Sequence, residues 1–203
     1  MKIEELVRKE VFELSLYEVE SVLKRKLDER VVKMDLNENF TLASDVMEKL
    51  LFDACRDIDV RVYPPPCGDM AIKAISSFLG FTESEISVGN GADEVLDLLM
   101  KVFVKKDSKV LVVEPTFPMY TYFTQLYGGR EVTVLLRSNF ELDIDAILKR
   151  IDRETPLLFI CSPNNPTGNQ FKEGDIKKIL QEFNGVVVVD EAYVDFAKYT
   201  AID

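Results

Sequence analysis

The sequence has 203 residues, of which 47% are hydrophobic and 30% are charged, a composition typical of a globular protein with one substantial core. The net charge of −11 and the lack of a dense Lys/Arg cluster argue against nucleic acid or an anionic membrane as a partner. No apolar run approaches the roughly 18 residues of a membrane-spanning helix, and the charged start of the chain does not fit a signal peptide. We therefore expect a soluble, cytoplasmic protein.

The first part of the chain is predicted to be largely helical, with a rigid break at a run of prolines. Apolar residues recur at helical spacing, and serine, aspartate and glycine stand where helices begin and end. Three consecutive prolines force an extended stretch. The expected elements are helix over about the first 30 residues, with its apolar face within 14–23, an extended segment at 31–39, a helix at 44–54, the proline run at 64–66 and a helix at 68–80.

The rest of the chain alternates between short apolar runs and amphipathic segments. The expected strands are 86–88, 109–113, 131–136, 157–161 and 186–189, and the expected helices are 92–104, 118–127, 143–151 and 175–183. Continuous apolar strands separated by helices are typical of a parallel sheet that is covered on both faces. The sequence therefore predicts an α/β fold with three layers, αβα, and a mainly parallel sheet.

The absence of histidine limits the chemistry of the chain. It excludes Ser-His-Asp and Cys-His catalysis and HExxH zinc sites. The three cysteines, Cys55, Cys67 and Cys161, are too few and too widely spaced for a disulfide framework or a zinc pattern, so we expect no metal site. An enzyme of this composition uses carboxylates, Lys, Tyr or Cys, or takes its chemistry from a cofactor.

The segment GNGADE joins an expected strand to an expected helix. Glycines allow a ligand to approach the backbone, and the N–H groups at a helix start favour an anion such as phosphate. A plain tight turn, with Asp93 and Glu94 complementing the helix dipole, explains the same residues. Glu94 also stands where a dinucleotide fingerprint has its third glycine, so the fingerprint is incomplete.

Two further segments follow expected strands at the end where open α/β sheets bind their ligands. CSPNNPTG offers asparagine amides from a loop stiffened by prolines, and as a plain turn it would place Gly168 at positive φ. VVVVDEAY reads as a fully buried strand followed at once by Asp190. A carboxylate in that position needs a hydrogen-bonding or cationic partner, unless the segment is a solvent-facing turn.

Together the three segments offer an anion site, an amide and a carboxylate, a set complementary to pyridoxal 5′-phosphate. The segments RVYPPP, GNGADEVL, EPTFPMY, CSPNNPTG and VVVDEAYVDF occur in the order found in fold-type-I aminotransferases that depend on pyridoxal phosphate. The chain most resembles the histidinol-phosphate aminotransferases, from residue 35 onward. The resemblance implies an N-terminal helical arm with part of a small domain at 1–43, and an incomplete cofactor-binding large domain at 44–203.

The resemblance also implies roles for individual residues. Asp190 would bond the pyridine nitrogen, and Asn165 and Tyr193 would bond the 3′ oxygen, with Asp190 and Tyr193 as catalytic residues. The remaining implied positions are the backbone of Ala92 and Asp93 at the phosphate, Phe117 stacked on the ring, Tyr63 at the cofactor phosphate of the other subunit of a homodimer, and Asn37 at the substrate. An ordinary core role explains Phe117 nearly as well, and packing beside the prolines explains Tyr63.

The implied reaction is transamination of histidinol phosphate with 2-oxoglutarate, in histidine biosynthesis. In the family the lysine that carries the cofactor lies a few dozen residues beyond DEAY, and the given sequence reaches Asp203; Lys198 is not assigned to that role. We therefore expect this chain alone not to transaminate. Other fold-type-I enzymes, such as aromatic or aspartate aminotransferases or threonine-phosphate decarboxylase, are alternatives, as are a non-catalytic interaction module and a Rossmann nucleotide-binding domain.

Overall fold

The structure, a computed structural model, describes residues 3–12, 14, 34–39, 41–56 and 58–202. The chain divides into two compact units, one formed by Met1–Ser15 with Gly89–Asp203 and the other by Leu16–Val88. The domain boundary expected at residue 44 stays a prediction. Among the described helices, none combines the length and apolar character that a membrane crossing requires.

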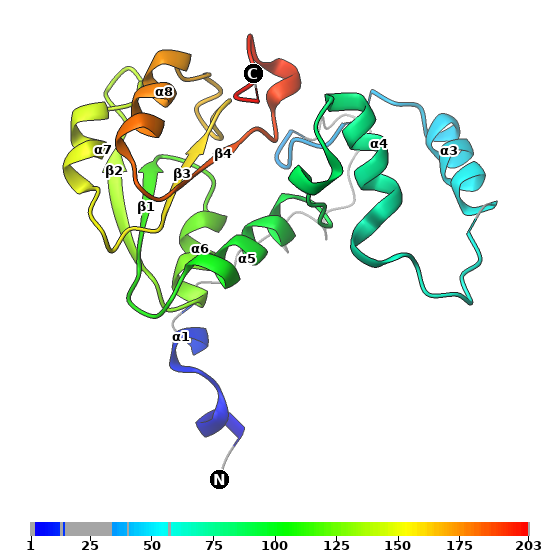
Figure 1. The fold of residues 1–203 in the computed structure, drawn as a ribbon, viewed down its shortest axis with the longest axis horizontal. Helices are drawn as coiled ribbons and strands as arrows, with labels where there is room; N and C mark the ends of the chain where they lie inside the picture. Colours follow the sequence, from blue (N-terminus) through cyan, green and yellow to red (C-terminus); the bar gives the residue numbers. More distant parts are fainter. Residues whose placement is uncertain (1–2, 13, 15–33, 40, 57, 203) are drawn as a thin grey trace. The chain divides into compact units, whose positions relative to one another are not determined.

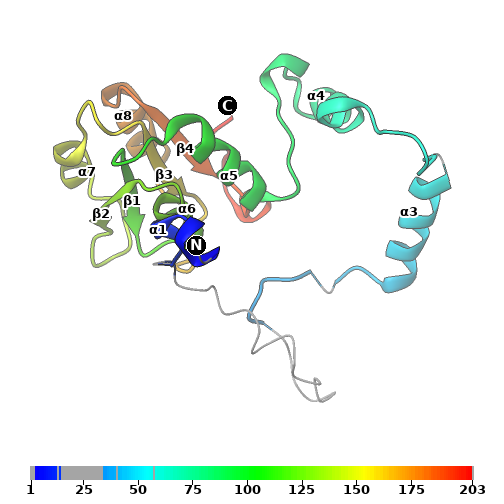
Figure 2. The same cartoon turned by 90° about the horizontal axis from the view of Figure 1, so that it is seen from below.

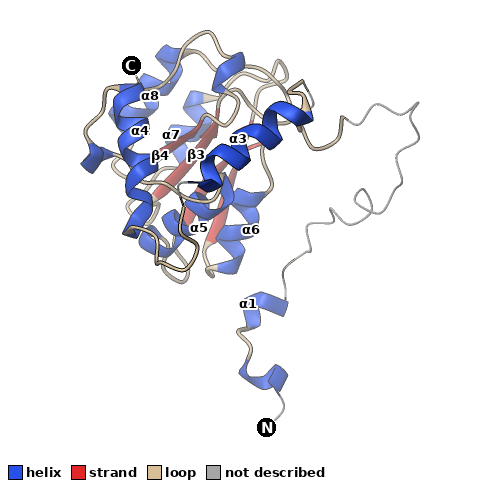
Figure 3. Ribbon diagram, turned by 90° about the vertical axis from the view of Figure 1, so that its right-hand side faces the viewer, coloured by secondary structure: helices blue, strands red, loops and turns tan. Residues whose placement is uncertain are grey.

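The first unit is built on a four-stranded parallel sheet in the order β2-β1-β3-β4 (Figure 1). The strands are β1 (Lys109–Glu114), β2 (Arg130–Leu135), β3 (Leu157–Cys161) and β4 (Val186–Asp190). They lie side by side in Figure 3, where they are red. The chain turns to opposite sides after β1, with β2 on one flank and β3 on the other. Such a reversal is where open α/β sheets leave room for a ligand.

Four helices cover the two faces of this sheet, as the α/β prediction requires. Helices α5 (Ala92–Phe103) and α6 (Met119–Leu126) pack on one face, and α7 (Ile144–Arg150) and α8 (Glu173–Glu182) pack on the other. Figure 2 shows the strands between α7 on one side and α5 on the other.

Alternate residues of each central strand enter different apolar clusters. Val110 and Val112 of β1 pack with the α5–α6 side, whereas Leu111 and Val113 pack with the α7–α8 side. Because both faces are buried, the strand is apolar at every one of these positions. The predicted three-layer arrangement is therefore confirmed.

Two strand predictions need correction. Residues 86–88 do not form a strand: Ile86 has extended dihedrals of φ −116° and ψ 132°, but the segment pairs with no strand among the described residues. A local preference for extended backbone does not make a strand without a hydrogen-bonded neighbour. The valines of β4 form the expected strand but are half-buried rather than fully buried, because β4 is at an edge of the described sheet.

The short elements complete the first unit. They are η1 (Ile3–Leu6) and α1 (Lys9–Phe12) near the start of the chain, and η4 (Val194–Phe196) after β4. The Arg8 guanidinium donates to the Leu126 carbonyl at 2.9 Å, which fastens the N-terminal segment to the end of α6.

The second unit contains α3 (Ser44–Arg56), η2 (Pro66–Gly68), α4 (Asp69–Leu79) and η3 (Glu83–Glu85). Helix α4 ends as predicted at Gly80, whose φ of 79° is the left-handed conformation that glycine adopts without strain. No residue of α3 or α4 is buried. The apolar face of the first predicted helix, within residues 14–23, lies, apart from Leu14, outside the described residues, as does the start of the extended segment at 31–39.

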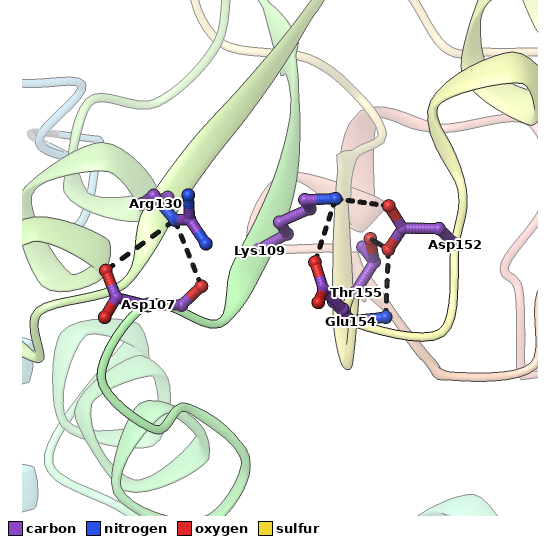
Figure 4. A network of polar contacts seen from close by, with 6 residues as sticks. All are labelled: Asp107, Lys109, Arg130, Asp152, Glu154 and Thr155. Carbon is purple, nitrogen blue, oxygen red and sulfur yellow. Dashed lines mark hydrogen bonds and ion pairs between the residues drawn. The ribbon is translucent and has the colours of Figure 1, made fainter.

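The amino ends of the strands carry charges that pair with one another (Figure 4). Lys109, at the start of β1, forms ion pairs with Asp152 and, at 3.1 Å, with Glu154. Arg130, at the start of β2, lies 3.7 Å from the Asp107 carboxylate and also donates to the Asp107 carbonyl. The Lys109 ammonium lowers the pKa of the Asp152 carboxyl, chiefly through their hydrogen bond.

Candidate cofactor-binding site

A cavity of about 300 Å³ lies at the carboxyl end of the sheet, entirely within the first unit. Its volume is at the lower end of the range for small-molecule sites, about 300–1,000 Å³. The cavity is lined by Asn90, Gly91, Ala92, Asp93, Phe117, Cys161, Asn165, Asp190, Ala192 and Tyr193. Six predicted site residues are among them, so the structure brings together Ala92, Asp93, Phe117, Asn165, Asp190 and Tyr193.

The start of α5 forms one wall of this cavity. Gly91 precedes the helix with φ 84° and ψ 173°, a region that only glycine adopts readily. Within the described part of the chain no side chain caps this helix, and the first-turn N–H groups of Ala92 and Asp93, two residues that line the cavity, have no acceptor inside the helix. The Glu94 carboxylate instead accepts a hydrogen bond from the Asn90 N–H and closes the preceding loop. This wall fits an anion such as a phosphate group.

The loop after β3 is held by the first of its two asparagines. Asn164 is 3% exposed; its amide donates to the Pro115 carbonyl at 2.9 Å and the Thr167 hydroxyl at 2.7 Å, and its carbonyl accepts from the Thr116 hydroxyl at 3.0 Å. Gly168 has a φ of 73°, as expected for the turn. These three bonds engage both the NH₂ group and the carbonyl of Asn164, and the half-buried Asn165 lines the cavity instead.

Asp190 ends β4 and is held by uncharged donors. The Tyr120 hydroxyl donates to Asp190 Oδ2 at 2.7 Å, and the Ala192 N–H donates to Oδ1 at 3.0 Å. The partner that the sequence required for this carboxylate is therefore a neutral phenol and a backbone amide. No lining residue of the cavity carries a cationic side chain.

Asp93 adds a second carboxyl group to the same cavity. Burial, and then the negative charge of Asp190, raises the pKa of the Asp93 carboxyl above its ordinary value. The site thus favours a ligand that brings a positive charge to Asp190.

Phe117 and Tyr193 provide the aromatic surfaces of the cavity. Phe117 is half-buried and packs against the α5–α6 apolar cluster while also lining the cavity, so the core and ligand interpretations both hold in part. Tyr193 is half-buried and stands immediately before η4.

Cys161 lies at the end of β3 and is 3% exposed. Burial raises the pKa of its thiol above the ordinary value, and the thiol donates to the Pro163 carbonyl at 3.3 Å. We therefore regard it as a neutral wall of the cavity rather than a nucleophile.

Sequence reasoning missed Tyr120 and the structural role of Asn164. Tyr120 is near Phe117 in the sequence, but Phe117 precedes α6 and Tyr120 lies within it, so helical spacing does not relate the two residues and the sequence carries no clear signal for Tyr120. Nothing in the sequence distinguished the two neighbouring asparagines, since their difference arises from contacts with residues 115–116.

Two predicted residues belong to the second unit. Tyr63 follows α3 along the chain and its side chain is 97% exposed; Asn37 has a positive φ of 53°. Their roles at the neighbouring subunit's phosphate and at the substrate stay predictions.

Residues 30–202 match the family model described as aminotransferase class I and II. The histidinol-phosphate aminotransferase of Thermoanaerobacter sp. (strain X514) is 38% identical over 203 residues, which cover 99% of this chain and 56% of that protein. The enzyme of the same name from Christiangramia forsetii is 41% identical over 143 residues, 70% of this chain and 41% of that protein. The chain thus spans about half the length of the curated relatives it matches.

Solved structures agree with this result. The Sinorhizobium meliloti histidinol-phosphate aminotransferase, solved in complex with pyridoxal-5′-phosphate, aligns with a TM-score of 0.65 and 26% identity over 72% of this chain and 40% of that chain. The N-succinyldiaminopimelate aminotransferase of Mycobacterium tuberculosis aligns with a TM-score of 0.65 and 30% identity over 72% of this chain and 42% of that chain.

The fold, the cavity and the family match define one class of protein: the chain belongs to the class I and II aminotransferases. Within that class, the two curated relatives named above are both described as histidinol-phosphate aminotransferases. The predicted family, the α/β fold class and pyridoxal phosphate as the cofactor are confirmed.

Proposed function

We propose that this chain supplies the cofactor-holding part of an aminotransferase that uses histidinol phosphate as amino donor and 2-oxoglutarate as acceptor. The observation that carries the cofactor part is the grouping of a helix start, an amide, a phenol and a carboxylate around one cavity. The substrate part rests on the similarity to histidinol-phosphate aminotransferases over nearly the whole chain.

Each wall of the cavity matches one group of the cofactor. The N–H groups of Ala92 and Asp93 hold the phosphate, because the helix start provides free donors and a positive dipole end. The Phe117 ring lies against the cofactor ring, and the Asn165 amide and the Tyr193 phenol bind its 3′ oxygen.

Asp190 holds the ring nitrogen in its protonated form. The Tyr120 hydroxyl and the Ala192 N–H that donate to Asp190 are neutral, so its negative charge is not cancelled within the lining of the cavity. Each oxygen accepts one hydrogen bond from the protein and retains capacity for another. When bound, pyridoxal phosphate supplies an electron sink for the substrate's α-carbon, and a protonated nitrogen strengthens it.

The remaining assignments extend to the whole protein. We assign Tyr63 to the phosphate of a second subunit in a homodimer and Asn37 to the substrate side, and we place the protein in the cytoplasm and in histidine biosynthesis. The Tyr63 side chain is exposed, and the three prolines that follow it restrict the backbone there.

One observation favours a second candidate, an aminotransferase with a different amino donor. A structure named for N-succinyldiaminopimelate aligns at 30% identity, above the histidinol-phosphate enzyme's 26% in the same comparison. Amino-donor assays on the protein that contains this chain separate the two: turnover of histidinol phosphate supports the first candidate, and its absence alongside good turnover of another donor contradicts it.

The cofactor assignment is tested by equilibrium dialysis of the chain against pyridoxal phosphate. We expect saturable binding to the unmodified chain, and about 30-fold weaker binding to Asp190→Asn, because a charge-assisted hydrogen bond to the ring nitrogen is lost. Asp152→Asn is the matched control, since the same change is made at the amino end of the sheet. Equal binding by all three proteins, or no binding to the unmodified chain, would contradict the assignment.

A further inference from the structure

Tyr120 is a buried phenol that contacts both halves of the candidate site. It lies on α6 and its side chain is 0% exposed. Its hydroxyl donates to Asp190 Oδ2 at 2.7 Å, and its ring meets the Phe117 ring edge-on, with centroids 5.8 Å apart and an interplanar angle of 82°.

The packing around Tyr120 fixes the position of its hydroxyl. The ring stacks on Phe159 of β3 with centroids 4.8 Å apart and an interplanar angle of 10°. The Tyr120 main-chain carbonyl accepts from the Thr124 hydroxyl at 2.7 Å. A ring held on one face by a strand residue and at its edge by Phe117 has little freedom to turn its hydroxyl elsewhere.

The Tyr120 hydroxyl is the donor in its hydrogen bond to Asp190. Burial, followed by the effects of Cys161 and Asp190, raises the pKa of the phenol far above its ordinary value. The phenol therefore loses its proton less readily than an exposed tyrosine does, and Asp190 Oδ2 is the acceptor in this bond.

The two hydrogen bonds on Asp190 set the direction of the carboxylate. Tyr120 engages Oδ2 and the Ala192 N–H engages Oδ1, one donor on each oxygen. A carboxylate that accepts on both oxygens from fixed donors cannot rotate without losing one of them. Its remaining acceptor capacity is then presented in a fixed direction.

We propose that Tyr120 is a positioning residue, which aims Asp190 at the ring nitrogen of bound pyridoxal phosphate and keeps that carboxylate in register with Phe117. The inference rests on the proposed function, since it requires Asp190 to meet the ring nitrogen. Tyr120 acts through Asp190 and Phe117 and does not line the cavity itself.

The test is a comparison of two ligands, pyridoxal phosphate and its 1-deaza analogue, in which a C–H group replaces the ring nitrogen. Dissociation constants are measured by equilibrium dialysis on the full chain and on Tyr120→Phe, which keeps the ring contacts and removes only the hydroxyl. We expect the variant to bind pyridoxal phosphate about fivefold more weakly, because the carboxylate loses one fixed donor. We expect binding of the 1-deaza analogue to change by less than about twofold, because it makes no bond to Asp190.

Tyr127→Phe is the matched control. Tyr127 also lies at α6, at its C-terminal cap, and its hydroxyl donates to a carboxylate, Asp97 Oδ1, at 2.6 Å, but neither residue lines the cavity. This variant should bind both ligands as the unmodified chain does. A double variant supplies a second readout: in an Asp190→Asn background, Tyr120→Phe should add nothing to the loss of cofactor affinity.

The inference is overturned if Tyr120→Phe binds pyridoxal phosphate as tightly as the unmodified chain, or if it weakens both ligands equally, since the latter indicates a general structural role. Additive losses in the double variant overturn it as well. Failure of the proposed function looks different, because the unmodified chain would then bind neither ligand, or would bind both with equal affinity before any variant is made.

Discussion

The two ends of the same sheet differ in whether their charged side chains are paired with opposite charges. At the amino end, Lys109 is paired with Asp152 and Glu154 in an exposed network (Figure 4). At the carboxyl end, Asp190 is held by a phenol and a backbone N–H, and Asp93 has a raised pKa because of burial and the charge of Asp190. The charged side chains at the amino end are therefore largely balanced by ion pairs. The carboxyl end holds negative charge without a cation among the cavity-lining residues.

This difference separates residues that serve the fold from residues that serve a ligand. Exposed ion pairs contribute little to stability and leave nothing for a ligand to complete. Uncompensated charge in a half-buried cavity is unfavourable until a complementary group arrives, and such arrangements concentrate at functional sites. Paired substitutions, made at the two ends or at neighbouring residues of one end, test whether the two groups of residues serve different purposes.

The largest effect is expected at the two adjacent asparagines. Asn164→Ala should lower the free energy of unfolding by about 2–3 kcal/mol, because the Pro115 carbonyl and the Thr116 hydroxyl lose their partners. Asn165→Ala, which removes a cavity-lining side chain, should change stability by less than about 0.5 kcal/mol and weaken binding of pyridoxal phosphate.

Urea denaturation followed by far-UV circular dichroism measures the first effect, and equilibrium dialysis measures the second. Similar losses of stability in both variants would show that the loop does not divide structure and binding between its two asparagines.

The sequence was sufficient to predict the fold in outline and most of the cavity. A continuous apolar run such as β3 indicates a strand that is buried on both faces. The pockets of parallel sheets form at the carboxyl ends of the strands, where polar residues follow such runs. Asp190 ends β4, Asn165 follows β3 and Ala92 begins α5, and the fold brings them to the same cavity.

What could not be predicted depends on contacts between distant residues. The hydrogen bond from Tyr120 to Asp190 spans 70 residues, and that from Thr116 to Asn164 spans 48. The burial of β4 depends on its neighbours in the sheet, which a run of four valines does not reveal. Residues 86–88 failed as a strand for the same reason, because pairing is not a local property.

The next largest effect on stability is expected at two glycines that differ in backbone conformation. Gly91→Ala should cost about 1–3 kcal/mol of stability, because φ 84° and ψ 173° strain any residue with a Cβ atom. No atom lies within 4 Å of the added Cβ, so the cost is in the backbone and not in a clash. Gly174→Ala, in α8, also meets no atom within 4 Å but should stabilise the protein by about 0.5–1 kcal/mol, because alanine favours a helix.

Thermal denaturation of the two glycine variants provides the measurement. Pyridoxal phosphate binding should weaken only in Gly91→Ala, whose loop presents the helix start to the cavity. Destabilisation by both substitutions, or by neither, would remove the link between the Gly91 conformation and the site.

The smallest effect tests the charge comparison itself, with one substitution made at each end. At pH 7, Asp93→Asn should raise the melting temperature, because the raised pKa means that the ionised carboxyl opposes folding. Asp152→Asn should lower it, because the Lys109 hydrogen bond lowers the pKa of Asp152 and its ionised form supports folding. Each change should be no more than about 2 °C, since both groups are largely accessible to solvent.

As the pH falls, the difference in melting temperature between each variant and the unmodified chain should disappear, first for Asp93→Asn and then for Asp152→Asn. The cost of ionised Asp93 is present above its raised folded-state pKa and disappears as the pH falls through that value to the unfolded value of about 3.9. The contribution of Asp152 is present above about 3.9 and is lost only as the pH falls further, through its lowered folded-state pKa. Melting curves of the three proteins between pH 7 and pH 2 measure this order. If both substitutions shift the melting temperature at pH 7 in the same direction, the two ends of the sheet do not differ in how their carboxylates affect stability.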